Sequence, residues 1–214
     1  MFYVLLLRTM KENKPFNLFR NLHFTELGHT SLLYKLLSKN GKHNMDDLFL
    51  RSFIIDVLKG NFVDNLLLEK EVKSGQKGYI DLIISTSDRK IIYCIESKVK
   101  RAKDRPNQLY RYWRNHIKKA KEDNIIGDFK LFYITMNGNK PTEISLCRPV
   151  VSKNTTKYDG LPDKLSEEDF ITLSYKKDIR NWLQYCLKQI PEEKDNLRLI
   201  YTLEQYIEWI EIQK

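Results

Sequence analysis

The sequence predicts an α/β protein in which a sheet of four to five strands carries helices on both faces. Three observations lead to this prediction. Apolar residues recur at helical spacing before residue 60 and again after Pro106, three apolar runs follow one another between residues 66 and 96, and a further apolar run follows at residues 129–135. Consecutive strands usually lie beside each other, so we expect the three central strands to form an antiparallel meander.

Two helices are predicted in the first part of the chain. The first begins at Thr25, a good helix-capping residue, and ends before Gly41, where the Asn-Gly pair stops the pattern. The second occupies residues 46–59 and is ended by a Gly-Asn pair. Both place apolar residues on one face, and we expect that face to pack against the sheet.

The three central strands are predicted at residues 66–72, from Gly78 up to a polar turn at residues 85–89, and at residues 91–96. If the turn between the last two lies at Ser87 and Asp88, Asp81 lies opposite Cys94. The alternation of side chains along a strand then places Glu96 and Lys98 on the same face as Asp81. A register shift of one residue would separate them, so the convergence depends on the turn.

The second half of the chain is predicted to add a helix, strands and two further helices. The helix after Pro106 is followed by strands at residues 129–135, at the sheet edge at residues 144–151, and at residues 170–175. We treat residues 1–214 as a single domain, in which residues 186–214 form a C-terminal helical extension, because no linker or repeat divides the chain.

Composition narrows the functional class only a little. The chain has 214 residues, 42% of them hydrophobic, and 37 Lys and Arg residues against 28 Asp and Glu residues, for a net charge of +9. This balance suits a polyanionic partner, but solvated lysine faces produce it equally well.

The three cysteines are far apart and form no Cys-x-x-Cys pair, so neither disulfides nor a cysteine zinc site is indicated, and a reducing cytoplasm fits best.

Membrane insertion is not indicated either. The apolar opening at residues 2–7 is far shorter than the roughly 20 residues of a membrane span, and no basic region precedes it.

A pair of acids closes two neighbouring predicted strands. The pattern acid-x-Lys occurs at six places in this lysine-rich chain, but only Glu96 ends a long apolar run and follows a second strand with its own acid, Asp81. Their carboxylates are hard oxygen ligands suited to Mg²⁺ or Mn²⁺. Lys98, on the same face, could hold an attacking water or stabilise charge on a phosphoryl group. The competing interpretation is an ordinary surface ion pair.

These residues resemble the PD-(D/E)XK nuclease superfamily, in particular a bacterial and phage branch of it. The resemblance covers about residues 20–185 and leaves residues 138–169 unmatched. It rests on Glu26–Leu33, Gly78–Asp81, Glu96–Lys98, Asn107–Tyr112 and Leu173–Leu183. The sequence departs from the family pattern at Ile80, where the family has proline, and at Ser97, where the branch often has asparagine.

The resemblance implies a restriction-endonuclease-like fold with a central mixed sheet. It also implies a metal-dependent nuclease that hydrolyses DNA phosphodiester bonds by attack of an activated water. Asp81, Glu96 and the backbone carbonyl of Ser97 would bind Mg²⁺ or Mn²⁺, Lys98 would serve the water, and Glu26 would complete the metal site. Glu26 has a second explanation, because acids are favourable at a helix N-terminus in any protein.

Further residues are expected around this centre. The resemblance places Gln108 beside the active site, one helical turn before Tyr112. Basic side chains nearby could follow the nucleic-acid backbone, although solvated basic faces are common. These basic candidates are Lys100, Arg101 and Arg111. His29 and His43 could orient metal ligands from an outer position, but a lone histidine is more often structural.

Two other functions remain open from the sequence. A catalytically inactive nucleic-acid-binding or assembly protein could have the same fold, and a small-molecule or structural α/β protein could be basic by chance. The sequence also leaves open the choice of DNA or RNA, of ends or internal bonds, of a homodimer or a monomer, and a role in bacterial or phage defence.

Overall fold

The computed structural model describes residues 16–21, 25–74, 78–99, 102–150 and 158–213. Its centre is a five-stranded sheet whose spatial order equals the chain order. The strands are β1 (Leu67–Lys73), β2 (Tyr79–Ser85), β3 (Ile91–Lys98), β4 (Asp128–Thr135) and β5 (Ile171–Ser174). Strands β1, β2 and β3 pair antiparallel, whereas β3, β4 and β5 pair parallel. The predicted meander and the mixed character of the sheet are therefore confirmed.

Many of the helical segments have only four to six residues, and some adjoin π-helical turns, labelled η. Before the sheet they are α2 (Leu18–Asn21), α3 (Glu26–Leu37), α4 (Leu48–Ser52) and η1 (Phe53–Val57). Between β3 and β4 they are α5 (Gln108–Tyr112), η2 (Trp113–Lys118) and α6 (Lys119–Glu122). The remainder are α7 (Glu143–Leu146), η4 (Tyr175–Ile179), α8 (Arg180–Gln189) and α9 (Leu197–Ile212).

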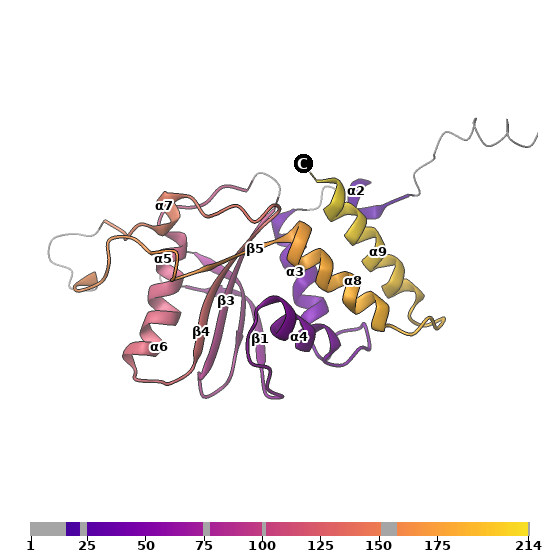
Figure 1. Cartoon of the computed structure of the whole chain (residues 1–214), viewed down its shortest axis with the longest axis horizontal. Helices are drawn as coiled ribbons and strands as arrows, with labels where there is room; N and C mark the ends of the chain where they lie inside the picture. Colours follow the sequence, from indigo (N-terminus) through magenta and orange to yellow (C-terminus); the bar gives the residue numbers. More distant parts are fainter. Residues whose placement is uncertain (1–15, 22–24, 75–77, 100–101, 151–157, 214) are drawn as a thin grey trace, which may run out of the picture.

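Helices cover both faces of the sheet (Figure 1). On one side, α3, α4, α8 and α9 pack with sheet residues such as Leu82 and Ile95 in one apolar cluster. On the other side, α5, η2 and α6 pack with sheet residues such as Ile83 and Cys94 in a second cluster. Strand β3 lies between the two clusters and is buried along its whole length, which explains why residues 91–95 are apolar without alternation.

The register between β2 and β3 differs from the prediction by two residues. Leu82 pairs with Ile95 and Ser85 with Ile92, so the ladder continued by one step sets Asp81 opposite Glu96 and not opposite Cys94. The turn is centred between Asp88 and the next residue, where the Asp88 carboxylate accepts hydrogen bonds from the Thr86 hydroxyl and the backbone N–H of residue 90. A shift of two residues preserves the face to which each side chain points.

The edge strand predicted at residues 144–151 is wrong. Residues 143–146 form the short helix α7, the only ladder contact of the described part of this segment is a single bridge between Cys147 and Lys164, and residues 151–157 lie outside the described residues. The Asp104 carboxylate accepts hydrogen bonds from the backbone N–H and hydroxyl of Thr142, both at 2.7 Å, and so fixes the chain at the start of α7. Here hydrogen bonds between two residues that are 38 positions apart in the chain determine the structure, although the local sequence pattern favours a strand.

Within the described part of the chain, no helix has both the length and the apolar character that crossing a bilayer requires.

Candidate active site

The candidate site lies where β2 and β3 stop pairing with each other. Their last backbone pair is Leu82 with Ile95. One residue further, the Asp81 carboxylate accepts a 2.8 Å hydrogen bond from the backbone N–H of Ser97. The Asp81 side chain therefore satisfies the backbone donor that a continued ladder would have used. Asp81 and Glu96 each lie two residues from an end of their strand.

Three carboxylates converge at this point. Glu26 reaches it from the first turn of α3, whose start is fixed by the Thr25 side chain accepting a hydrogen bond from the Gly28 N–H at 3.2 Å. Together with Asp81 and Glu96 it offers a set of oxygen atoms that all lie within 4.8 Å of one another. The sequence motifs on two strands and one helix are thus brought into a single cluster.

Glu96 is the most buried member of the cluster, with 2% of its surface exposed. Its Oε1 accepts hydrogen bonds from Lys98 Nζ at 2.5 Å and from Gln108 Nε2 at 2.7 Å. Its Oε2 is buried and, among the described residues, has no hydrogen-bond partner. A buried carboxylate oxygen without a partner is costly, so this atom points to a ligand that the protein itself does not supply.

Burial and crowding raise the pKa of both strand acids. Burial is the larger cause for Asp81, whose pKa rises to about 6 even though the Ser97 N–H and Lys98 oppose the shift. Burial and then the Asp81 charge raise the pKa of Glu96 to about 8. The cluster is therefore short of positive charge at neutral pH, which is the condition that a bound cation relieves.

Lys98 supplies part, but not all, of the positive charge that the carboxylate cluster needs. Its Nζ also contacts Glu26 Oε1 at 3.1 Å, and 8% of the residue is exposed. Burial lowers its pKa, but the attraction and hydrogen bonds of Glu96 and Glu26 outweigh burial, so the pKa is raised overall. Lys98 is consequently an ammonium group held between two carboxylates.

The donor set fits a hard divalent cation. Only carboxylate oxygens converge in the cluster, and this favours Mg²⁺ or Mn²⁺ over zinc. The nearby Cys94 is fully buried and burial raises the pKa of its thiol, so it is not available as a thiolate ligand.

Comparison with known families agrees with this geometry. Residues 16–207 match the family model of the PD-(D/E)XK nuclease superfamily, a stretch that contains the whole cluster and Lys98. The chain belongs to the PD-(D/E)XK nuclease superfamily. Comparison with curated proteins and with solved structures returned no match. The mixed five-stranded sheet with helices on both faces is the restriction-endonuclease-like fold that membership implies.

Some of the outer residues expected in this member of the PD-(D/E)XK nuclease superfamily contact the cluster. Gln108 is 4% exposed and links Glu96 to the hydroxyl of Tyr112, which lies 2.9 Å from its Nε2. Tyr112 in turn donates to the backbone carbonyl of Tyr79 at 2.6 Å, close to Asp81 along β2. The two residues tie α5 to both acidic strands.

Other expected residues do not meet it. The ring nitrogens of His43 pair with the Ser38 carbonyl and the Met45 N–H, both at 3.0 Å, so this side chain stabilises the loop after α3. Arg111 donates to the carbonyl of Pro106 at 2.7 Å. The predicted basic residues Lys100 and Arg101 lie outside the described residues.

A buried chain of side chains beneath the site was missed by the sequence reasoning. Ser97 Oγ lies 2.8 Å from the Tyr175 hydroxyl, Tyr175 is hydrogen-bonded to Tyr206, and the Tyr206 hydroxyl lies 2.9 Å from His29 Nδ1. His29 is therefore linked to Ser97 through the two tyrosines. Tyr206 belongs to α9, so the C-terminal helix is connected through Tyr175 to Ser97, the residue between Glu96 and Lys98.

We expect Tyr206→Phe to lower the free energy of unfolding by about 1–3 kcal/mol, because it leaves buried partners of the hydroxyl unsatisfied. Chemical denaturation of the two proteins measures this change. The matched control is Tyr201→Phe on the same helix, where the side chain is 56% exposed and no change is expected. Equal stability of Tyr206→Phe and wild type would show that the buried chain is not a structural element.

Proposed function

We propose that this PD-(D/E)XK nuclease hydrolyses DNA phosphodiester bonds with the help of Mg²⁺ or Mn²⁺. The observation that carries the proposal is the buried, unpartnered Oε2 of Glu96 beside the carboxylates of Asp81 and Glu26. A descendant of the family that only binds nucleic acid has no physical need for such a cluster, because carboxylates repel phosphate.

The three carboxylates would hold the cation. Asp81 and Glu96 would bind it directly, together with the Ser97 backbone carbonyl, and Glu26 would bind it directly or through water. When bound, a divalent cation neutralises charge on the phosphoryl group and makes water a better nucleophile near neutral pH. Gln108 would keep the Glu96 carboxylate in place through its 2.7 Å hydrogen bond.

Lys98 would act on the reacting phosphate and the attacking water. The raised pKa of Lys98 favours a positively charged side chain, which donates hydrogen bonds and does not accept a proton. We therefore assign it the roles of orienting the water and stabilising negative charge on the phosphoryl oxygens, while the water loses its proton to solvent or phosphate. Attack forms the new P–O bond while the bond between phosphorus and the 3′-oxygen breaks, and the departing 3′-oxygen takes a proton from solvent. The products are a 5′-phosphate and a 3′-hydroxyl.

Purified protein tested on labelled DNA and RNA, single- and double-stranded, decides this proposal. We expect cleavage of DNA with Mg²⁺ or Mn²⁺ and none with EDTA. Asp81→Asn, purified in the same way, controls for contaminating nucleases and should be inactive. Failure to cut any of these substrates, or equal cutting by Asp81→Asn, would favour the alternative of an inactive nucleic-acid-binding protein on the same fold.

A further inference from the structure

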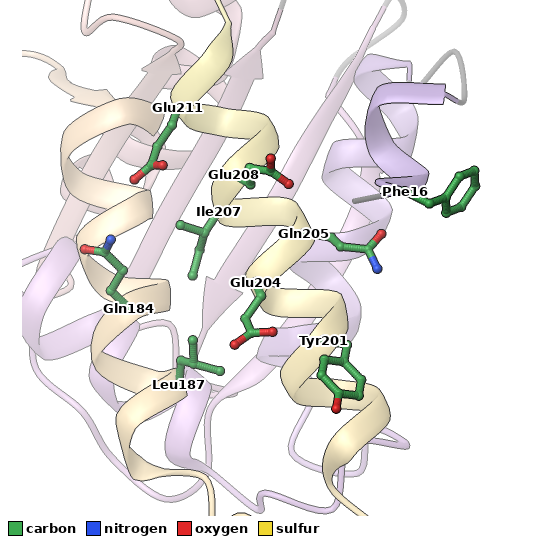
Figure 2. A pocket seen from close by; sticks show the side chains of 9 residues that line it. All are labelled: Phe16, Gln184, Leu187, Tyr201, Glu204, Gln205, Ile207, Glu208 and Glu211. Carbon is green, nitrogen blue, oxygen red and sulfur yellow. The ribbon is translucent and has the colours of Figure 1, made fainter. Parts of the chain in front are cut away.

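Two large hollows in the described part of the protein differ in charge. The first lies between α8 and α9 and has a volume of about 550 Å³; its rim carries Glu204, Glu208 and Glu211, with no Lys or Arg among its lining residues (Figure 2). The second, about 620 Å³, contains Lys98, Lys103 and Lys140 among its lining residues. Glu208 and Glu211 of the first hollow pair with Arg20 and Arg180, and Lys98 of the second pairs with Glu96 and Glu26. The second hollow is still the more favourable one for a polyanionic strand, because it also carries Lys103 and Lys140.

The second hollow, which we name the Lys98 cleft, adjoins the carboxylate cluster. It is lined by Lys98 at the end of β3, by Thr135 at the end of β4, and by residues within the ranges 102–104 and 136–144. The strands β3 and β4 run parallel, and open α/β sheets bind ligands outside the carboxyl ends of such strands. A phosphate at the cluster therefore has the Lys98 cleft as its immediate neighbour.

The Lys98 cleft offers a ligand the positive charge of Lys103 and Lys140, since Lys98 itself is held by Glu96 and Glu26. Its one acidic lining residue, Asp104, is occupied by 2.7 Å hydrogen bonds from the Tyr133 hydroxyl and from the N–H and hydroxyl of Thr142. Lys140 contacts Glu167 at 2.5 Å, but their side chains are 63% and 77% exposed, so the pair is weak and a phosphate can replace the carboxylate.

The remaining walls suit a nucleobase. Met136, Ala102 and Ile144 supply apolar surface, while the amides of Asn137 and Asn139 supply hydrogen-bond donors and acceptors. Ligand sites of roughly 300–1,000 Å³ bury most of a small organic molecule, and the Lys98 cleft falls in this range. One nucleotide can enter a space of this size, whereas a base-paired double helix cannot.

The catalytic groups are also recessed. Glu96 is 2% exposed and Lys98 is 8% exposed, so the reacting phosphate must approach into the protein. A flexible single strand can bend toward such a site, whereas the stiff duplex must first open locally at the cost of unpairing and unstacking bases.

We propose that the Lys98 cleft binds one unpaired nucleotide next to the scissile phosphate, so that the enzyme acts on single-stranded DNA in preference to intact duplex. This inference rests on the proposed nuclease function and names its substrate class. Lys103 and Lys140 contact the phosphates that flank this nucleotide, and Ile144 contacts its base.

Binding tests the Lys98 cleft independently of cleavage. Fluorescence anisotropy in EDTA compares a labelled single strand with the same strand in a blunt duplex. We expect wild type to bind the single strand at least about 10-fold more tightly, and Ile144→Trp, which fills the cleft from a half-exposed position, to lose this preference. The control Ile126→Trp, at a position that is 93% exposed and outside the cleft, should bind as wild type does.

Charge provides a second binding test. The double variant Lys103→Ala/Lys140→Ala should weaken single-strand binding and reduce its salt dependence, whereas Lys188→Ala on α8 should change neither. Tighter binding of duplex by wild type, or unaltered single-strand binding by Ile144→Trp, would overturn the inference.

Cleavage of the same two substrates with Mg²⁺ separates this inference from the proposed function. A faster rate on the single strand, abolished in Ile144→Trp, supports both. Equal or faster cutting of blunt duplex overturns the substrate preference and leaves the nuclease function intact. If neither substrate is cut, the nuclease function fails, and the anisotropy result still decides whether the Lys98 cleft holds an unpaired nucleotide.

Discussion

Lys98→Ala is expected to lower the rate of DNA cleavage about 10²–10⁴-fold, the range that a positioned proton-transferring or charge-stabilising side chain contributes. The substitution removes the ammonium group that contacts Glu96 and Glu26 at 2.5 and 3.1 Å. It should not weaken cation binding, because it takes away a positive charge that competes for the same carboxylates. Single-turnover cleavage and Mn²⁺ titration measure the two effects separately.

Lys90→Ala is the matched control for this experiment. Lys90 precedes β3 at the end opposite to Lys98, and its side chain is 67% exposed in a surface pair with Asp88. It should retain the wild-type rate. A Lys98→Ala protein that cuts within a few-fold of wild type would remove Lys98 from the reaction, and one that loses Mn²⁺ would show that its role is to hold the carboxylates.

Glu96→Gln is expected to abolish cleavage and to weaken Mn²⁺ binding by more than the roughly 10–100-fold that loss of an outer partner of a ligand costs. In EDTA, however, the variant should be at least as stable as wild type near pH 8. The amide keeps an acceptor for Lys98 and Gln108 but carries no buried negative charge. Isothermal titration with Mn²⁺ and denaturation in EDTA measure the two results.

The pH dependence of stability should differ between the two proteins. The pKa of Glu96 is raised from 4.5 to about 8, so in this interval the unfolded wild-type chain has released a proton that the folded protein keeps. Folded wild type therefore loses stability as pH rises from about 4.5 to 8, by on the order of 1–3 kcal/mol, and Glu96→Gln lacks this contribution. Added Mn²⁺ should make wild type the more stable of the two proteins, because it stabilises wild type alone. A variant less stable than wild type in EDTA across this range would show that Glu96 is a structural ion pair.

The sequence predicted the strands of the sheet well because burial dictates their composition. Strand β3 lies between helices on both sides and its first five residues are all apolar, so no alternative structure competes for residues 91–95. The register was predicted less well. The hydrogen bonds made by the Asp88 carboxylate place the turn one residue later than expected, which moves the partner of Asp81 from Cys94 to Glu96.

The acidic cluster was predictable because Asp81 and Glu96 lie near the ends of apolar strands and Glu26 begins a helix, each in a short, recognisable motif. The chain from Ser97 through Tyr175 and Tyr206 to His29 was not, since Tyr206 and His29 are 177 residues apart and each fits the apolar stripe of its own helix. The Lys98 cleft was hidden for a similar reason. Its walls come from loops after β3 and β4, and loop geometry depends on contacts such as those of Asp104 with Thr142.

The central claim is that Asp81 and Glu96 share one cation. Anomalous scattering from crystals soaked in Mn²⁺ tests it directly. The account predicts one Mn²⁺ peak in contact with Asp81, with Glu96 Oε2 and with the Ser97 carbonyl oxygen, and no peak at this position in crystals of Glu96→Gln. A wild-type crystal in which Mn²⁺ binds elsewhere, or in which Glu96 stays paired only with Lys98 and Gln108 at saturating Mn²⁺, would contradict it.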